Sequence, residues 1–186
     1  MRKEYECLLE DIDTSMEWAS DAFGTEIDAV NFWMGSHRSV TTIHSDNYEN
    51  LYCVISGQKT FELYPPTNVD IFKHKRKYQM AKYHLDSVSK EWSVEPQRPA
   101  QFVEWIDDFK TDQIPGMQVI VNPGDLLYLP SLWYHKVTQT EDNFGKCIAV
   151  NMWYDMQFDI KFNTIHFVQN VVNILKQPDE QECKEI

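Results

Sequence analysis

Three features are missing from the sequence: a long apolar run, an internal repeat and a pair of closely spaced cysteines. No apolar run approaches the roughly 20 residues that a membrane span needs, and the first six residues, MRKEYE, lack the apolar core of a signal peptide. The cysteines form no C-x-x-C pair, and Cys53 and Cys147 lie in apolar runs that are typical of buried thiols. These absences predict a protein of a reducing compartment, the cytoplasm, the nucleus or both, with no membrane partner.

Basic residues are also few: 17 Lys and Arg stand against 29 Asp and Glu, which gives a formal net charge of -12. A surface of that sign repels phosphates and attracts basic partners, so it disfavours nucleic acid. The basic run over residues 73–77 (KHKRK) is interpreted as a solvated loop, although it is the one local support for binding to RNA.

Hydrophobic residues make up 42% of the chain and aromatic residues 13%, which suits one compact domain with a substantial core and a lined pocket. Short apolar runs between turn signals predict strands over residues 40–44, 50–55, 59–64, 117–121, 126–129, 133–138 and 147–154. The expected fold is mainly β, a small barrel or jelly roll with flanking helices.

The expected organisation is a helical segment over residues 1–30, a barrel core over 31–155, a helix over 156–177 and a polar tail over 178–186. The core is interrupted by residues 67–116, an insertion with little regular structure, either a functional lid or elements that the pattern does not reveal. In the C-terminal helix, apolar residues recur at steps of three and four and form two stripes. One stripe can cover the sheet and the other can meet a partner, which predicts a homodimer.

The chemistry is expected from an H-x-D pair, His44 and Asp46. In an extended segment these two side chains point to the same face, because side chains alternate with period two. His135 follows 91 positions later (135 minus 44) inside an apolar strand. Two histidines and one carboxylate can hold one face of an octahedral ion and leave three positions open, as in non-haem iron(II) oxygenases. The alternative is a hydrogen-bonded core histidine beside an Asp that caps a turn.

Lys59 begins a strand in an otherwise apolar pattern. A buried lysine needs a counter-charge, and a small dicarboxylate cosubstrate could supply it. The alternative is a lysine on the outer face of the strand.

These residues lie within longer motifs that resemble a known family. The segment NFWMGSHRSVTTIHSDNYENLYCVISGQKTFELYPP resembles the first half of a Jumonji C (JmjC) domain, and GDLLYLPSLWYHKV followed by CIAVNMWYD resembles the second half. The resemblance covers about residues 25–175 and is strongest to the lysyl hydroxylase subgroup of the Jumonji-domain-containing protein 7 type. It implies a double-stranded β-helix, the cupin-like jelly roll. Family members carry further strands before this region, so the N-terminal part of the family domain is expected to be missing.

The resemblance also implies roles for particular residues. His44, Asp46 and His135 would be the catalytic iron(II) ligands, and Thr41 and Lys59 would bind the distal carboxylate of the cosubstrate 2-oxoglutarate. Asn50, Tyr52 and Asn151 would line the cosubstrate pocket, with ordinary sheet packing as the alternative. Thr41 precedes His44 by three residues, so it shares the face of His44 only if the strand contains a bulge.

The activity implied is an iron(II)- and 2-oxoglutarate-dependent dioxygenase that consumes O2 and hydroxylates a protein. The expected reaction is (3S)-lysyl hydroxylation of a developmentally regulated GTP-binding protein. The alternatives are a tRNA hydroxylase or histone demethylase of the same superfamily, and a non-catalytic cupin-like module for binding or dimerisation. An endopeptidase has no support in the sequence, which contains no H-E-x-x-H motif.

Overall fold

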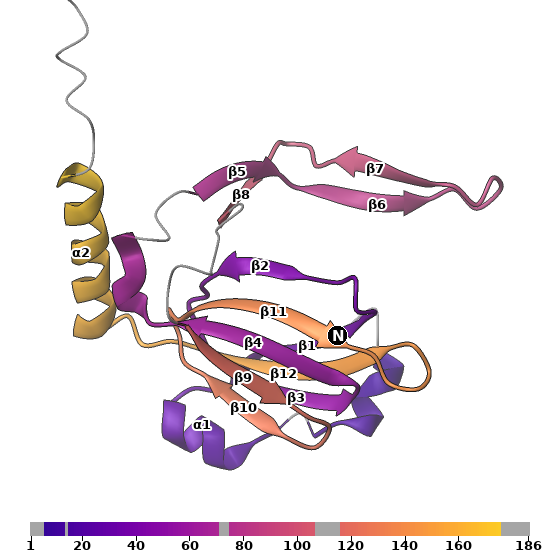
Figure 1. Ribbon diagram of the computed structural model, residues 1–186, viewed down its shortest axis with the longest axis horizontal. Helices are drawn as coiled ribbons and strands as arrows, with labels where there is room; N and C mark the ends of the chain where they lie inside the picture. Colours follow the sequence, from indigo (N-terminus) through magenta and orange to yellow (C-terminus); the bar gives the residue numbers. More distant parts are fainter. Residues whose placement is uncertain (1–5, 14, 71–74, 107–115, 176–186) are drawn as a thin grey trace, which may run out of the picture.

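The computed structural model describes residues 6–13, 15–70, 75–106 and 116–175, and its centre is a barrel of two four-stranded antiparallel sheets (Figure 1). The first sheet has the order β1 (Ile27–Gly35), β12 (Cys147–Asp155), β3 (Tyr48–Ser56) and β10 (Leu126–Leu129). The second has the order β2 (Thr41–His44), β11 (Tyr134–Thr140), β4 (Gln58–Tyr64) and β9 (Met117–Val121). The predicted jelly-roll architecture is confirmed.

The core lies between the sheets because the strands alternate in burial. In β4, Lys59, Phe61 and Leu63 are buried while the residues between them are partly exposed. Strand β12 is buried on both faces: Ala149 packs between the sheets, whereas Met152 packs against helix α1 (Glu17–Phe23). The sequence run CIAVNMWYD is correspondingly apolar on both faces, as expected for a central strand.

A tight hairpin joins β3 to β4 at Gly57. This residue has φ +73°, a left-handed conformation that favours glycine, and a Cβ at its position would lie 2.6 Å from the Thr140 carbonyl oxygen. The predicted short Gly-containing link between these strands therefore has both a conformational and a steric reason.

The helices flank the barrel. They are η1 (Glu6–Asp11), α1, η2 (Pro66–Asp70) and α2 (Ile160–Leu175). Helix α2 lies beside η2 (Figure 1), and the Asp159 carboxylate caps its N-terminus by accepting hydrogen bonds from the backbone N–H groups of Lys161 and Phe162. Helix α2 therefore begins at Ile160 rather than at 156, and the predicted tail over 178–186 lies outside the described residues. Within the described part of the chain, no helix is long and apolar enough to cross a membrane.

One sequence-based expectation is wrong: strand β1 begins at Ile27, inside the segment expected to be helical, because residues 29–35 pair with β12 in antiparallel register. The insertion over 67–116 contains more regular structure than expected, and of its two interpretations the one with elements that the pattern does not reveal agrees with the structure. There, β5 (Lys75–Gln79) pairs with β8 (Phe102–Ile106), and β6 (Ala81–Leu85) pairs with β7 (Trp92–Pro96). These ribbons extend from the barrel in Figure 1. The basic run expected to be a loop enters β5 at Lys75, while residues 73 and 74 lie outside the described part.

Candidate metal centre

Three side chains converge at one mouth of the barrel: His44 at the end of β2, Asp46 just after it, and His135 near the start of β11. Each offers a ligand atom, and these atoms all lie within 4.8 Å of one another. Asp46 Oδ2 is 3.7 Å from His44 Nε2 and 3.6 Å from His135 Nε2. Strands β2 and β11 pair with His44 opposite His135, so the sheet register itself brings the two imidazoles together. The three ligand atoms are close enough to bind one ion.

Each imidazole is held by a hydrogen bond to the backbone carbonyl two residues before it. His44 Nδ1 donates to the Thr42 carbonyl oxygen at 2.8 Å, and His135 Nδ1 donates to the Trp133 carbonyl oxygen at 3.0 Å. A carbonyl can only accept, so the proton of each neutral ring lies on Nδ1 and the Nε2 lone pair is free. The two hydrogen bonds therefore fix the orientation of both rings and leave each Nε2 able to bind a metal.

Burial sets the protonation of the site. His135 is only 5% exposed, and burial, with a smaller contribution from the nearby His44, lowers the pKa of its imidazole to about 3. Burial raises the pKa of the Asp46 carboxyl, and His44 partly offsets that effect. A neutral His135 at physiological pH is the form that binds a metal.

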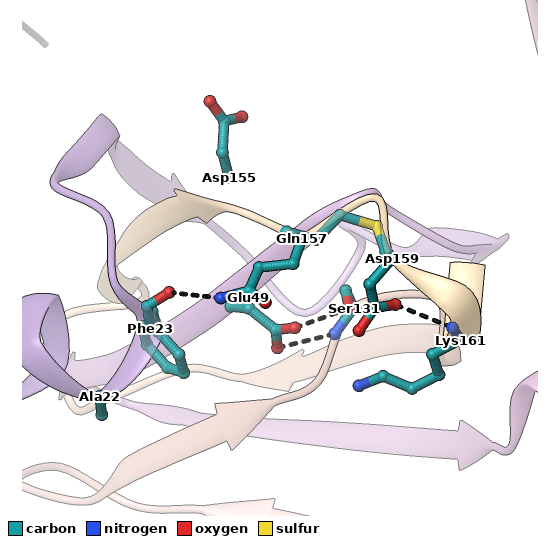
Figure 2. Close-up of a pocket in the computed structure, with 9 residues that line it drawn as sticks. Ala22, Phe23, Glu49, Ser131, Asp155, Gln157, Asp159 and Lys161 are labelled. Carbon is teal, nitrogen blue, oxygen red and sulfur yellow. Dashed lines mark hydrogen bonds between the residues drawn. The ribbon is translucent and has the colours of Figure 1, made fainter. Parts of the chain in front are cut away.

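Hydrogen bonds join two segments that are far apart in the sequence, one that carries Asp46 and one that precedes His135. The Leu132 backbone N–H donates to the Asp46 carbonyl oxygen at 2.8 Å. The Glu49 carboxylate accepts from the backbone N–H of Ser131 at 3.1 Å, from the Ser131 hydroxyl at 2.7 Å and from the Tyr128 hydroxyl at 2.7 Å. Figure 2 shows Glu49 and Ser131 joined in this way in a second, smaller cavity of about 150 Å³. These bonds fix the loop before His135 to the loop that carries Asp46.

The candidate ligands open onto a cavity of about 300 Å³ inside the barrel. All eight predicted site residues line it: Thr41, His44, Asp46, Asn50, Tyr52, Lys59, His135 and Asn151. Asn151 Nδ2 donates to Asn50 Oδ1, and Trp33 Nε1 donates to Asn151 Oδ1, both at 2.9 Å, so these amides have fixed orientations. The structure brings the predicted residues together in one place.

Lys59 lies in this cavity, 6% exposed, and its ammonium contacts the Oε1 atom of Gln139. Burial lowers the pKa of the Lys59 ammonium. Among the described residues, neither a hydrogen bond nor an ion pair joins Lys59 to a carboxylate. A buried cation with only an amide partner is electrostatically incomplete, and a carboxylate ligand would complete it.

Thr41 reaches the cavity through a bulge. His135 pairs with His44, and Val137 pairs with Thr41, so two steps along β11 correspond to three steps along β2. The extra residue restores Thr41 to the face of His44, which strict alternation would forbid.

The sequence did not identify several residues that line the cavity. Gln139 follows His135 and Val137 at period two in β11, so alternation could have revealed it. Trp33 belongs to the strand β1 that was not predicted. Trp105 comes from β8 in the insertion, and its ring lies 5.0 Å from the His44 ring, edge-on. No local signal in the sequence indicated that contact.

A jelly roll with two imidazoles and one carboxylate at its mouth, beside a buried lysine, defines a cupin-type protein with a candidate metal centre. The comparison with protein families agrees: the chain belongs to the Cupin-like domain family, whose profile matches residues 1–160.

Several curated relatives are JmjC proteins. Lysine-specific demethylase JMJ32 of Arabidopsis thaliana is 38% identical over 188 residues, which covers 92% of this chain and 54% of the relative. Bifunctional peptidase and (3S)-lysyl hydroxylase JMJD7 of Homo sapiens is 37% identical over 174 residues, with 88% and 53% covered. JmjC domain-containing protein E of Dictyostelium discoideum is 33% identical over 199 residues, with 94% and 56% covered. The predicted resemblance to JmjC proteins is confirmed, and the chain spans about half the length of these relatives.

Proposed function

We propose that this chain is an iron(II)- and 2-oxoglutarate-dependent oxygenase, with His44, Asp46 and His135 as the metal ligands. The observation that carries the proposal is the convergence of these three side chains within 4.8 Å beside the buried Lys59. Two imidazoles and a carboxylate are a donor set that suits iron(II) and leaves coordination positions for a cosubstrate and O2.

The residues of the cavity have different binding roles. Lys59 and Thr41 bind the distal carboxylate of 2-oxoglutarate, while Asn50, Tyr52 and Asn151 line the cosubstrate pocket. Iron(II), when bound with 2-oxoglutarate and O2, supplies the oxidising power needed to hydroxylate an aliphatic carbon. The aromatic side chains of Trp33, Trp105 and Trp153 in the wall exclude water from that chemistry.

The substrate we propose is a lysyl side chain of a protein. The name of the human relative includes (3S)-lysyl hydroxylase, and the net charge of -12 suits a basic polypeptide. The resemblance noted in the sequence points to a developmentally regulated GTP-binding protein as the target. Three Arabidopsis relatives are named lysine-specific demethylases, which favours a second candidate, the oxidation of an N-methyl group on lysine.

Succinate release decides whether the chain is an oxygenase. The chain loaded with iron(II) should release succinate from 2-oxoglutarate under O2, and His44→Ala should abolish that release. His84→Ala, an exposed histidine in β6, is the matched control and should retain it. Equal turnover by wild type and His44→Ala would remove the metal assignment and favour a non-catalytic cupin-like module.

Mass spectrometry separates the candidate substrates. Hydroxylation adds the mass of one oxygen atom to a lysine-containing peptide, whereas demethylation removes a methylene from a methylated one. A filter-binding assay with tRNA tests the remaining alternative, for which binding is expected to be weak because the chain is acidic.

A homodimer through α2 is part of this proposal. Ile160, Phe167 and Ile174 recur every seven residues on α2 and are 79%, 67% and 69% exposed. A seven-residue apolar repeat suits packing against another helix. Helix α2 contains no acidic residue, so a second copy meets no acidic side chain of α2 along this stripe.

A further inference from the structure

One side chain of the cavity wall, Gln139, links the two sheets of the barrel next to Lys59. Gln139 is 7% exposed and lies directly opposite Lys59 in the pairing of β11 with β4. Its Nε2 atom donates a hydrogen bond to the carbonyl oxygen of Ser36, just after β1, at 2.6 Å. Its Oε1 atom accepts a hydrogen bond from the Lys59 ammonium. The amide therefore connects the end of β1 in one sheet to β4 in the other.

These two contacts allow the amide only one orientation. An ammonium can only donate and a carbonyl oxygen can only accept, so Oε1 faces Lys59 and Nε2 faces Ser36. The space around the amide agrees with this orientation, because a Cβ at position 35 would lie 2.6 Å from Nε2 and Gly35 has none. Gln139 therefore presents a fixed acceptor to the Lys59 ammonium.

The Ser36 carbonyl also favours an uncharged side chain at position 139. In a glutamate, the oxygen that replaces Nε2 would lie 2.6 Å from the Ser36 carbonyl oxygen, and neither of these two acceptors has a proton to share. Glutamine satisfies the carbonyl, whereas glutamate would give the buried Lys59 a counter-charge at the expense of this contact. The local backbone thus favours a neutral partner for Lys59.

The positive charge of Lys59 is therefore not balanced by a carboxylate of the described residues. An ammonium has three donors, and Gln139 accepts from one of them. The Cys147 thiol also acts on the pKa of Lys59, but burial raises the pKa of that thiol, so it is uncharged at physiological pH. A ligand that brings its own negative charge to Lys59 gains an interaction that a neutral ligand does not.

The position of Gln139 suits the far end of a ligand that also reaches the metal. Gln139 and His135 line the same cavity, and they lie on one face of β11, four residues apart. That separation is about 13 Å along a strand. The Lys59 side chain and a short diacid together can span it, with the diacid's other end at the metal ligands.

We propose that Gln139 makes the cavity selective for a dicarboxylate, because it orients the Lys59 ammonium without neutralising it and leaves the counter-charge to the distal end of the ligand. This inference rests on the proposed function, which assigns 2-oxoglutarate to the cavity. Gln139 acts through Lys59 and is therefore a positioning residue rather than a catalytic one.

Calorimetry with manganese(II) in place of iron tests the selectivity without turnover. The two ligands are 2-oxoglutarate and 2-oxopentanoate, which has a methyl group in place of the distal carboxylate. Wild type should bind 2-oxoglutarate at least about 30-fold more tightly than 2-oxopentanoate. Gln139→Glu supplies the counter-charge from the protein and should reduce that preference at least about tenfold. Its affinity for 2-oxopentanoate should stay within about threefold of wild type, because the methyl group carries no charge to be repelled.

Two neutral comparisons and a second charged variant complete the set. Gln139→Met removes both hydrogen bonds without adding charge and should reduce the preference no more than about threefold. Gln118→Glu adds the same charge at an exposed position of β9 and should leave the preference unchanged. Gln139→Asp has a shorter carboxylate that stays clear of the Ser36 carbonyl, and it replaces Gln139→Glu if that variant does not fold. All variants should bind manganese(II) as wild type does.

An unchanged preference in the charged variants would overturn the role of Gln139. Equal losses of preference in Gln139→Glu and Gln139→Met would also overturn it, because they would show that only the hydrogen bonds matter and not the charge. A large loss in the charged variants with a small loss in Gln139→Met would support it.

Succinate release separates this inference from the proposed function. A preference that falls in the charged variants, with no succinate released by wild type, would support the role of Gln139 and refute the oxygenase. Succinate release by wild type, with an unchanged preference in the charged variants, would refute the role of Gln139 and leave the oxygenase intact. A wild type that binds neither 2-oxo acid would overturn both.

Discussion

The ammonium of Lys59 in β4 contacts the side-chain amide oxygen of Gln139 in β11, and both residues are buried inside the barrel. The amide stabilises the ammonium only partly, because it is a dipole and not a counter-charge. An anionic ligand should therefore bind next to this pair, where its charge can stabilise the Lys59 ammonium.

Replacing Lys59 should weaken the binding of 2-oxoglutarate and leave metal binding unchanged. Lys59→Met is expected to raise the Kd for 2-oxoglutarate at least about 30-fold, equivalent to roughly 2 kcal/mol, with metal affinity unchanged because the three ligands are untouched. Calorimetry with manganese(II) in place of iron measures both. Lys136→Met, a partly exposed lysine 3.0 Å from Glu62, is the control and should bind 2-oxoglutarate normally. Normal binding by Lys59→Met would refute the assignment.

Two glycines with the same backbone conformation test the hairpin between β3 and β4. Gly57 and Gly145 both have φ +73°, but an added Cβ at Gly57 would lie 2.6 Å from the Thr140 carbonyl oxygen, whereas at Gly145 no heavy atom lies within 4 Å. Gly145→Ala should lower the free energy of unfolding by about 1 kcal/mol, the conformational cost alone. Gly57→Ala should cost about 2 kcal/mol more from the clash. Equal losses in urea titrations would contradict the steric argument.

Glu49 is expected to hold the metal site in shape. It accepts three hydrogen bonds from Ser131 and Tyr128, and Gln in its place cannot accept them all. Glu49→Gln should lower the free energy of unfolding by about 1–3 kcal/mol and weaken metal binding, because Ser131 precedes the Leu132 N–H that holds Asp46. The exposed Glu91→Gln should leave both quantities unchanged. Weaker stability with unaltered metal affinity would show that the two loops are not coupled.

The buried His135 predicts how the stability of the metal-free protein depends on pH. Its pKa is about 3 in the folded state and about 6.5 when unfolded, so between these values the unfolded chain binds the extra proton. The free energy of unfolding should therefore fall as the pH drops from about 6.5 toward 3, by at most about 1.4 kcal/mol per pH unit. The raised pKa of Asp46 acts in the opposite direction, because the folded carboxyl takes up its proton first.

Urea titrations with a chelator at several pH values measure this slope. His135→Gln should have a shallower slope than wild type across the same interval. Identical slopes would mean that the ring of His135 is not kept neutral by burial.

The dimer proposed through α2 is tested on its exposed stripe. Phe167→Ser with Ile174→Ser should shift the sedimentation coefficient from dimer to monomer, because it removes two of the three apolar side chains of the stripe. Asn170→Ser, an exposed polar residue of the same helix, should not. A wild-type protein that is monomeric at high concentration would contradict the dimer.

Periodicity predicted the barrel well where strands are apolar and bounded by turns. Strands β9 and β10 have the predicted bounds, 117–121 and 126–129. Strand β1 was not predicted, because the aromatic and polar residues of NFWMG show no clean alternation and follow an acidic segment typical of helices. In β6 and β7, the alternation of apolar residues spans only five residues each, too short to stand out from the surrounding polar chain.

The site was more predictable than its surroundings because its motif is compact. His44 and Asp46 follow from period two, and Gln139 could have followed from His135 by the same rule. The position of Thr41 could not be predicted from alternation, because the bulge that reorients it depends on pairing with β11. The position of Trp105 could not be predicted either, since only the path of β5 and β8 brings residue 105 to residue 44.

The hydrogen bonds from His44 and His135 to backbone carbonyls two residues before them have a consequence for metal exchange. Since these carbonyls rather than the ion orient both rings, withdrawing the ion should leave the two imidazoles in their metal-binding orientations. A stripped sample should keep its barrel and reload rapidly, and among first-row ions the choice then depends on which one is most abundant around the protein.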